Sequence, residues 1–166
     1  MRDDLIADLL HFLGRKCGFE AGHAPTSVQR ELDALPIPLD LKRLLQWRWP
    51  KTVAAIGPYQ VVPAEQVLED ERLTRLLEAE MVPVGIARNG DLLVLRFGKE
   101  KAAVGLVSHD QLWEGGASPE DAFVTVTPTV EEYLFRAAED RFLPIDSFSA
   151  SELNALRDEI RSRSET

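Results

Sequence analysis

The strongest constraint on the fold is the stretch MVPVGIARNGDLLVLRF at residues 81–97. It holds two apolar runs of strand length, separated by a short polar step that contains Asn89 and Gly90. Asn-Gly suits the tight turn of a β-hairpin, because both residues tolerate the positive φ required at its two central positions. A calcium loop would need further oxygen ligands at alternate positions, whereas two leucines directly follow Asp91. The stretch therefore predicts an antiparallel hairpin and no cation site.

Short apolar and β-branched runs predict further strands on both sides of this hairpin. They lie at residues 52–57, 59–63, 102–107 and 122–127, and the first two are short enough to be extended edge segments. The GKEK step at residues 98–101 predicts a second turn. We therefore expect a three-stranded meander from residue 81 to residue 107, with a further strand after it.

Apolar residues at helical spacing predict helices before and after the strands. These are an N-terminal helix at 3–16, two helices between residues 28 and 47, a helix from Pro63 to Leu77 with a possible break near EDER, a helix after Thr129, and a C-terminal helix at 150–162. Thr129 with Glu132, and Ser149 with Glu152, have the spacing of capping boxes. This order of elements indicates an α+β fold, with a single twisted antiparallel sheet and helices packed mainly on one face.

The length of 166 residues predicts a single domain at 1–166. The apolar runs are far shorter than the roughly 20 residues of a membrane-spanning helix. Asp3 and Asp4 stand where a secretory signal would be basic, so neither a membrane span nor a standard export signal is expected. Cys17 is the only cysteine and can form no internal disulfide. These features predict a cytoplasmic protein.

The net charge of -9 argues against direct binding to nucleic acid, because phosphate contacts come from clustered Lys and Arg. Most of the imbalance lies in residues 101–166, which hold 13 acidic and 6 basic groups. Such a surface can simply oppose self-association. It can also steer and dock a basic partner, because like charges gathered on one face raise the association rate with the opposite sign.

The sequence contains no nucleophile motif, phosphate-binding loop or metal-binding motif. His11, His23 and His109 are scattered, and none has a second ligand at metal-binding spacing. His109 and Asp110 could form an acid–base pair, but neighbouring side chains on a strand point to opposite faces. Cys17 has basic neighbours that could lower its pKa, a weak indication of reactivity. We therefore expect no catalytic residue, cofactor or metal, and no enzymatic activity.

The tryptophans indicate a binding surface, because aromatic residues often anchor interfaces. In QWRWP, we expect one of Trp47 and Trp49 to pack beneath the sheet and the other to lie at the surface. The segment HDQLWEGGASPEDA at 109–122 contains two adjacent glycines and a Ser-Pro step, which predict a long exposed loop that presents Trp113. The candidate partner-binding residues in or beside this loop are Asp110, Trp113, Glu114, Glu120 and Asp121.

Four segments, in order, resemble motifs of the SUKH superfamily. This is the group that contains the yeast cell-wall-assembly regulators (Smi/Knr-like) and many bacterial toxin-immunity proteins. The segments are ELDALPIPLDLKRLLQW at 31–47, MVPVGIARNGDLLVLRF at 81–97, AAVGLVSHDQ at 102–111 and VTVTPTVEEYLFRA at 124–137. The resemblance covers a core of about 28–140. The helices predicted at 3–16 and 150–162 are additions to it, and the acidic turn is shorter and less rich in glycine than in the family.

This resemblance implies an α+β fold whose sheet and loops receive a protein partner without catalysis. The partner it implies is commonly a secreted toxin domain, which the chain would neutralise as an immunity protein by covering its active site. Toxin nucleases are usually basic, so an acidic inhibitor over a phosphate-binding cleft would be electrostatically favourable. The alternative is an intracellular regulatory or scaffold module that binds a client protein.

Overall fold

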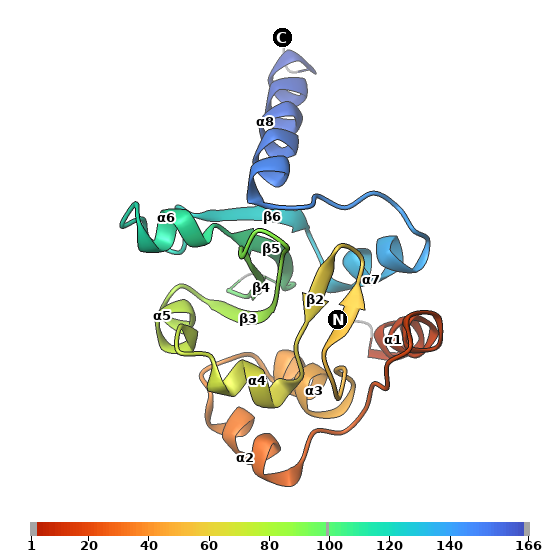
Figure 1. Ribbon diagram of the computed structural model, residues 1–166. Helices are drawn as coiled ribbons and strands as arrows, with labels where there is room; N and C mark the ends of the chain where they lie inside the picture. The colour runs from red at the N-terminus through yellow and green to blue at the C-terminus, as the bar shows by residue number, and fades with distance from the viewer. Residues whose placement is uncertain (1–2, 99, 165–166) are drawn as a thin grey trace.

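The protein, seen here as a computed structural model that describes residues 3–98 and 100–164, is built around one antiparallel sheet (Figure 1). The six strands lie side by side in chain order, which is the predicted meander. They are β1 Ala54–Ile56, β2 Tyr59–Val61, β3 Met81–Ile86, β4 Leu92–Arg96, β5 Ala103–Val107 and β6 Phe123–Thr127. The α+β fold class expected from the sequence is therefore confirmed.

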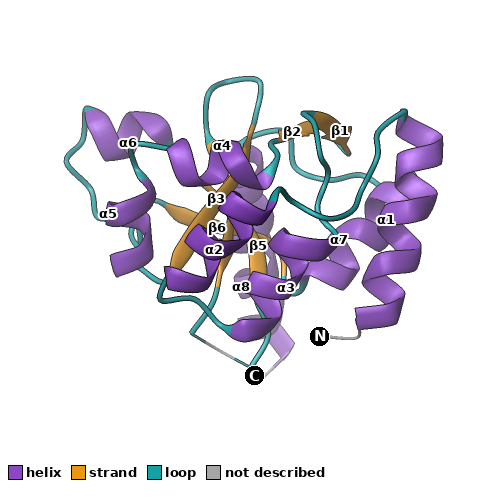
Figure 2. Ribbon diagram, turned by 90° about the horizontal axis from the view of Figure 1, so that it is seen from below, coloured by secondary structure: helices purple, strands orange, loops and turns teal. Residues whose placement is uncertain are grey.

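Eight helices surround this sheet in the described part of the chain. They are α1 Asp3–Cys17, α2 Thr26–Ala34, α3 Leu39–Trp47, α4 Ala64–Glu69, α5 Leu73–Glu78, α6 His109–Trp113, α7 Val130–Ala138 and α8 Ser147–Ser164. Helices α5 and α6 lie at one end of the molecule and α1 lies at the opposite end (Figures 1 and 2). None of the described helices combines the length and the hydropathy needed to cross a membrane.

The sheet separates two apolar clusters of unequal size. Successive residues of a strand point to opposite faces, and accordingly Leu93 and Leu95 of β4 join the large cluster while Leu92 and Val94 join the small one. The large cluster takes buried side chains from α1, α2, α3, α4, α7 and α8, and the small one from α5 and α6. The helices thus pack mainly on one face, as expected. Because both faces are covered, the central strands are continuous apolar runs and not alternating ones.

The β3–β4 hairpin closes through a turn that differs in detail from the prediction. Gly90 N–H donates to Ala87 O at 3.0 Å, and Ala87 N–H donates to Asp91 O at 2.8 Å. Gly90 has φ 94°, but Asn89 does not have a positive φ. The connection is therefore a three-residue loop that ends in a left-handed glycine. The expectation of positive φ at both Asn89 and Gly90 is wrong, because the longer loop needs only one such residue.

The predicted break near EDER separates α4 from α5. Asp70 follows the last residue of α4, and its carboxylate accepts hydrogen bonds from Arg72 N–H at 2.9 Å and from Arg72 Nε at 2.7 Å. Burial alone would raise the pKa of Asp70, but the hydrogen bonds and charge of Arg72 lower it below its usual value. A local side-chain bond to the backbone competes with helix continuation, which accounts for the break.

The two tryptophans of QWRWP separate as the sequence predicts. Trp49 is 2% exposed, belongs to the large cluster and donates from Nε1 to Val62 O at 2.8 Å. Trp47 is 42% exposed, and the guanidinium of Arg43 lies over its ring at 6.0 Å. The N–H of the buried indole is hydrogen-bonded to the backbone, as buried tryptophans usually require. Trp49 therefore packs in the core, and Trp47 lies at the surface.

Helix α8 begins at Ser147, earlier than the predicted start at residue 150. Asp146 Oδ1 accepts from Ser149 N–H at 2.9 Å, so Asp146 caps the helix. The expected capping box of Ser149 and Glu152 is therefore wrong. Ala150 is fully buried, and α8 packs against β6 and β5. From there the helix extends away from the rest of the chain (Figure 1).

Helix α7 starts at the predicted Thr129 cap, whose Oγ1 accepts from Glu132 N–H at 3.1 Å. We expect Thr129→Ala to lower the free energy of unfolding by about 1 kcal/mol, because it leaves that N–H without its cap. Thr129→Ser keeps the hydroxyl and should stay within about 0.5 kcal/mol of the wild type. Urea denaturation of the three proteins measures both values, and equal losses in the two variants would contradict the assigned cap.

Candidate functional site

The segment predicted as a long exposed loop instead begins with helix α6. Ser108 precedes the helix as its cap, and its Oγ accepts from Gln111 N–H at 3.4 Å. Leu112 is buried in the small cluster and anchors the helix to the sheet. The loop prediction is therefore wrong for residues 109–113, because the glycines lie further along and burial of Leu112 favours a helical turn here.

The predicted partner-binding residues all lie on α6 or on the loop that returns from it to β6. Trp113, the last residue of α6, is 54% exposed. Asp110 and Glu114 on the same helical stretch are exposed, as are Glu120 and Asp121 in the loop. The structure therefore gathers an exposed indole and four exposed carboxylates within one surface segment.

Two of these carboxylates already have partners inside the protein. Asp121 Oδ2 accepts from Ser118 Oγ at 2.9 Å, and Ser118 Oγ accepts from Asp121 N–H at 3.2 Å. Asp110 Oδ1 lies 2.8 Å from His109 Nε2, yet its side chain remains 70% exposed. Glu114 and Glu120 lie at the surface nearby. The segment therefore combines a locally ordered backbone with carboxylates that face solvent.

A groove of about 350 Å³ lies between α5 and the loop after α6. Arg75, Glu78 and Glu120 line it together with residues 116–119. Arg75 Nη2 donates to Ala117 O at 3.0 Å, which holds this loop against α5. The exposed Glu78 and Glu120 therefore make the rim of the groove partly acidic.

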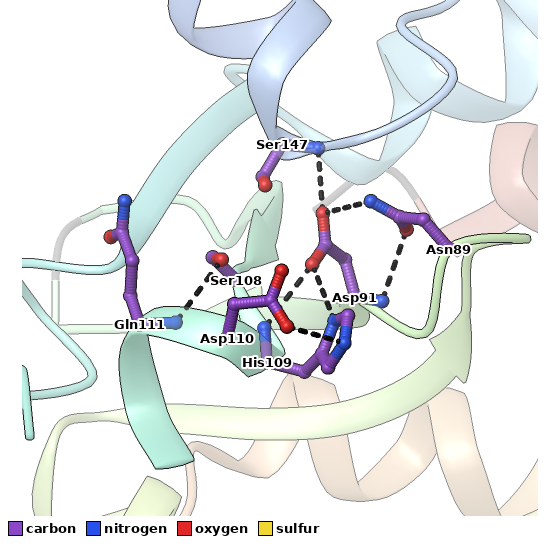
Figure 3. Close-up of polar contacts among 7 residues, drawn as sticks. All are labelled: Asn89, Asp91, Ser108, His109, Asp110, Gln111 and Ser147. Atoms are coloured by element: carbon purple, nitrogen blue, oxygen red, sulfur yellow. Dashed lines mark hydrogen bonds and ion pairs between the residues drawn. The ribbon is translucent and has the colours of Figure 1, made fainter. Parts of the chain in front are cut away.

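The predicted arrangement of His109 and Asp110 is wrong. We expected neighbouring side chains on opposite faces of a strand, but both residues belong to α6. The His109 ring lies between two carboxylates, with Nδ1 3.1 Å from Asp91 Oδ1 and Nε2 2.8 Å from Asp110 Oδ1 (Figure 3). Which nitrogen carries a proton is set by these partners. The imidazole thus links the hairpin to the surface of α6.

Asp91, at the end of the hairpin turn, is the centre of this cluster and is only 1% exposed. Oδ1 accepts from His109 N–H at 3.1 Å. Oδ2 accepts from Ser147 N–H at 2.8 Å and from Asn89 Nδ2 at 2.9 Å (Figure 3). One buried carboxylate therefore joins the hairpin, the start of α6 and the start of α8.

The environment of Asp91 shifts its pKa in two opposing directions. Burial disfavours the carboxylate and by itself would raise the pKa, whereas hydrogen bonds from Ser147, Asn89 and His109 favour it. The hydrogen bonds prevail, and the pKa of Asp91 lies below its usual value. The group is therefore held as an anion in the folded protein at neutral pH.

From the sequence we predicted Asp91 only as a turn residue, and the structure shows this further role. A signal was present, because Asp91 directly precedes the apolar residues Leu92 to Leu95 of a central strand. A carboxylate at the start of a strand buried on both faces needs hydrogen-bond partners. Its partners lie 18 and 56 residues further along the chain, at His109 and Ser147. Their identity could not be read from local spacing.

The other candidate residues lie apart from this cluster. His11 and Cys17 are exposed on α1, and Lys16 beside Cys17 pairs with Asp140 at 2.6 Å. His23 is exposed and lines a separate cavity of about 290 Å³. Among the residues whose side chains the structure describes, no group of three or more His, Cys, Asp or Glu is placed to hold a metal ion.

The protein is therefore an α+β protein with a meander sheet. Its candidate site consists of an acidic surface helix that carries Trp113, together with the buried aspartate Asp91 beside it. Comparisons of the chain with protein-family models, curated proteins and solved structures give no match.

Proposed function

We propose that the chain is a non-enzymatic protein-binding module whose docking face is formed by α6 and the loop after it. The observation that carries this proposal is Trp113, a large apolar side chain left 54% exposed at the end of a helix that is otherwise anchored. Tryptophan is among the residues most enriched at the energetic centres of interfaces. An indole in this position supports a role in contact with another macromolecule.

The charge around Trp113 favours a partner with a basic surface. Asp110, Glu114, Glu120 and Asp121 are exposed beside it, and Glu78 adds a carboxylate at the neighbouring groove. Summed charge of one sign speeds encounter with the opposite sign and disfavours partners of like charge. This arrangement fits a basic protein and disfavours nucleic acid.

The resemblance to the SUKH superfamily favours a toxin domain as the partner, which the chain would neutralise as an immunity protein by covering the toxin's active site. A basic nuclease domain would match the acidic docking face. Affinity capture from a lysate of the source cells, followed by identification of the retained protein, distinguishes a toxin domain from an intracellular client. Trp113→Ala should abolish retention of the specific partner, because it removes the anchor of the interface.

Reversal of the charges of Glu114, Glu120 and Asp121 to lysine in one variant should slow association with the captured and purified partner. We expect about a tenfold decrease in the association rate at low salt, with a smaller change in dissociation, because rim charges act mainly on encounter. The effect should shrink at high salt, where exposed charges are screened. Stopped-flow or surface-binding kinetics at two ionic strengths measure it.

A matched control reverses three exposed carboxylates elsewhere, Asp4 and Asp8 on α1 and Glu31 on α2. Its net charge changes by the same amount, but α1 lies at the opposite end of the molecule from α6 (Figure 2). Association of the control should change much less. Equal slowing by both variants would show that only net charge matters, and an unchanged rate in the first variant would refute the docking face.

A further inference from the structure

We propose that Asp91 is the positioning residue of the docking helix, and that it links the start of α6 to the first turn of α8. The inference rests on the proposed function only in treating α6 as the docking helix. In physical terms, the side chain of Asp91 holds the starts of α6 and α8 in fixed positions relative to the sheet.

The two carboxylate oxygens of Asp91 serve different elements. Oδ1 contacts α6 through His109, with the backbone N–H and ring Nδ1 both at 3.1 Å. Oδ2 contacts α8 through Ser147 N–H at 2.8 Å. Because the two oxygens belong to one rigid group, a rotation that improves one contact alters the other.

Each helix start has a local cap of its own, Ser108 for α6 and Asp146 for α8, and Asp91 is the side chain that contacts both starts. His109 and Ser147 are the first residues of their helices, where backbone N–H groups lack partners within the helix. Asp91 supplies an acceptor to both of these N–H groups. A negatively charged acceptor is also favoured at the positive end of a helix dipole. The orientation in which α6 presents Trp113, one turn after His109, therefore depends on this carboxylate.

The test compares amide hydrogen exchange in the wild type and in Asp91→Asn. Asparagine has the same shape, but its amide group offers only one acceptor and no charge. We expect protection to fall about tenfold or more at His109 and Leu112 in α6 and at Ser147 and Ala150 in α8. The amide of Tyr133 in α7, bonded to Thr129 O at 3.2 Å, should change by less than about threefold.

A second variant, His109→Ala, keeps the backbone N–H that Asp91 accepts and removes the ring contacts with Asp91 Oδ1 and Asp110 Oδ1. If one carboxylate links the two helices, exchange at Ser147 should rise about threefold although Ser147 is 38 residues away in the chain. The matched control is Asp110→Asn, which removes a carboxylate from the other side of the same imidazole. Asp110→Asn should leave amide exchange at Ser147 unchanged, because Asp110 is exposed.

Two results would overturn the inference. Loss of protection confined to α6, with α8 unaffected in both Asp91→Asn and His109→Ala, would show that the helices are not linked. An equal loss at Tyr133 would show that Asp91 contributes only to global stability. His109→Ala still provides the test if Asp91→Asn does not fold. The hydrogen-exchange measurement uses no partner, so its outcome does not depend on whether the proposed function is correct.

Discussion

Asp91→Ala is expected to lower the free energy of unfolding by about 4 kcal/mol at neutral pH. The substitution removes a carboxylate that is 1% exposed and leaves the backbone N–H groups of His109 and Ser147 without their acceptor. Each buried donor left without a partner costs about 1–3 kcal/mol. Urea denaturation followed by circular dichroism measures the change.

The loss of stability in Asp91→Ala should also depend on pH. The pKa of Asp91 is lowered in the folded protein, so its contribution is fully present above the unfolded-state pKa of about 3.9. It is lost as the pH falls through the folded-state value. The difference in unfolding free energy between the wild type and Asp91→Ala should therefore be smaller at about pH 2.5 than at about pH 5.

Asp110→Ala is the control for this prediction, because its carboxylate contacts the same imidazole from the solvent side. An exposed ion pair contributes at most about 1 kcal/mol, so we expect only a small loss of stability. Similar losses in the two variants would contradict the central role of Asp91. A difference between wild type and Asp91→Ala that grows in acid would contradict the lowered pKa.

The second large effect is expected from Gly85→Ala in β3. A Cβ at this position would lie 2.4 Å from the backbone oxygen of Gln60 and 3.2 Å from Val61 Cα, so β2 would have to move. Two residue pairs within the strands, Gln60 with Ile86 and Val61 with Gly85, join β2 to β3. We expect a loss of about 3 kcal/mol, at the upper end of the cost of overpacking.

Displacement of β2 should also weaken the neighbouring hydrogen bond from Val62 N–H to Val84 O, which is 2.9 Å long. Urea denaturation and amide exchange at Val62 measure the two effects. The matched control is Gly22→Ala, whose Cβ would meet only the flexible end of Lys51, with Cε at 3.0 Å. It should cost less than about 0.5 kcal/mol. An equally small loss in Gly85→Ala would show that β2 accommodates the methyl group.

Local patterns in the sequence were sufficient to predict most of the secondary structure. The Asn-Gly step indicated the hairpin because its apolar flanks are continuous and a turn must separate them. Thr129 marked the start of α7 because a capping hydroxyl acts within three residues. The sequence also predicted that one of Trp47 and Trp49 would be buried and the other exposed. Trp47 is the last residue of α3, and Trp49 lies beyond the helix in the core.

Two of the errors involve a tertiary contact that overrides a local preference. The segment at 109–113 is followed by glycines and was predicted as a loop, but burial of Leu112 against the sheet makes it helical. Ser149 has the local spacing of a cap, yet α8 begins earlier because Asp91 and Asp146 hold the N–H groups of Ser147 and Ser149. The contact of Leu112 with the sheet and that of Ser147 with Asp91 join residues brought together by the fold, whereas the Asp146 cap is local.

By itself the sequence determined the meander, the helical segments around it and the acidic, tryptophan-bearing segment after β5, because periodicity, turn residues and charge act over short distances along the chain. Only the tertiary structure decided that Asp91 is a buried anion between α6 and α8. Its hydrogen-bond partners are 18 and 56 residues away, and a carboxylate chooses its partners by proximity in space once the sheet has closed.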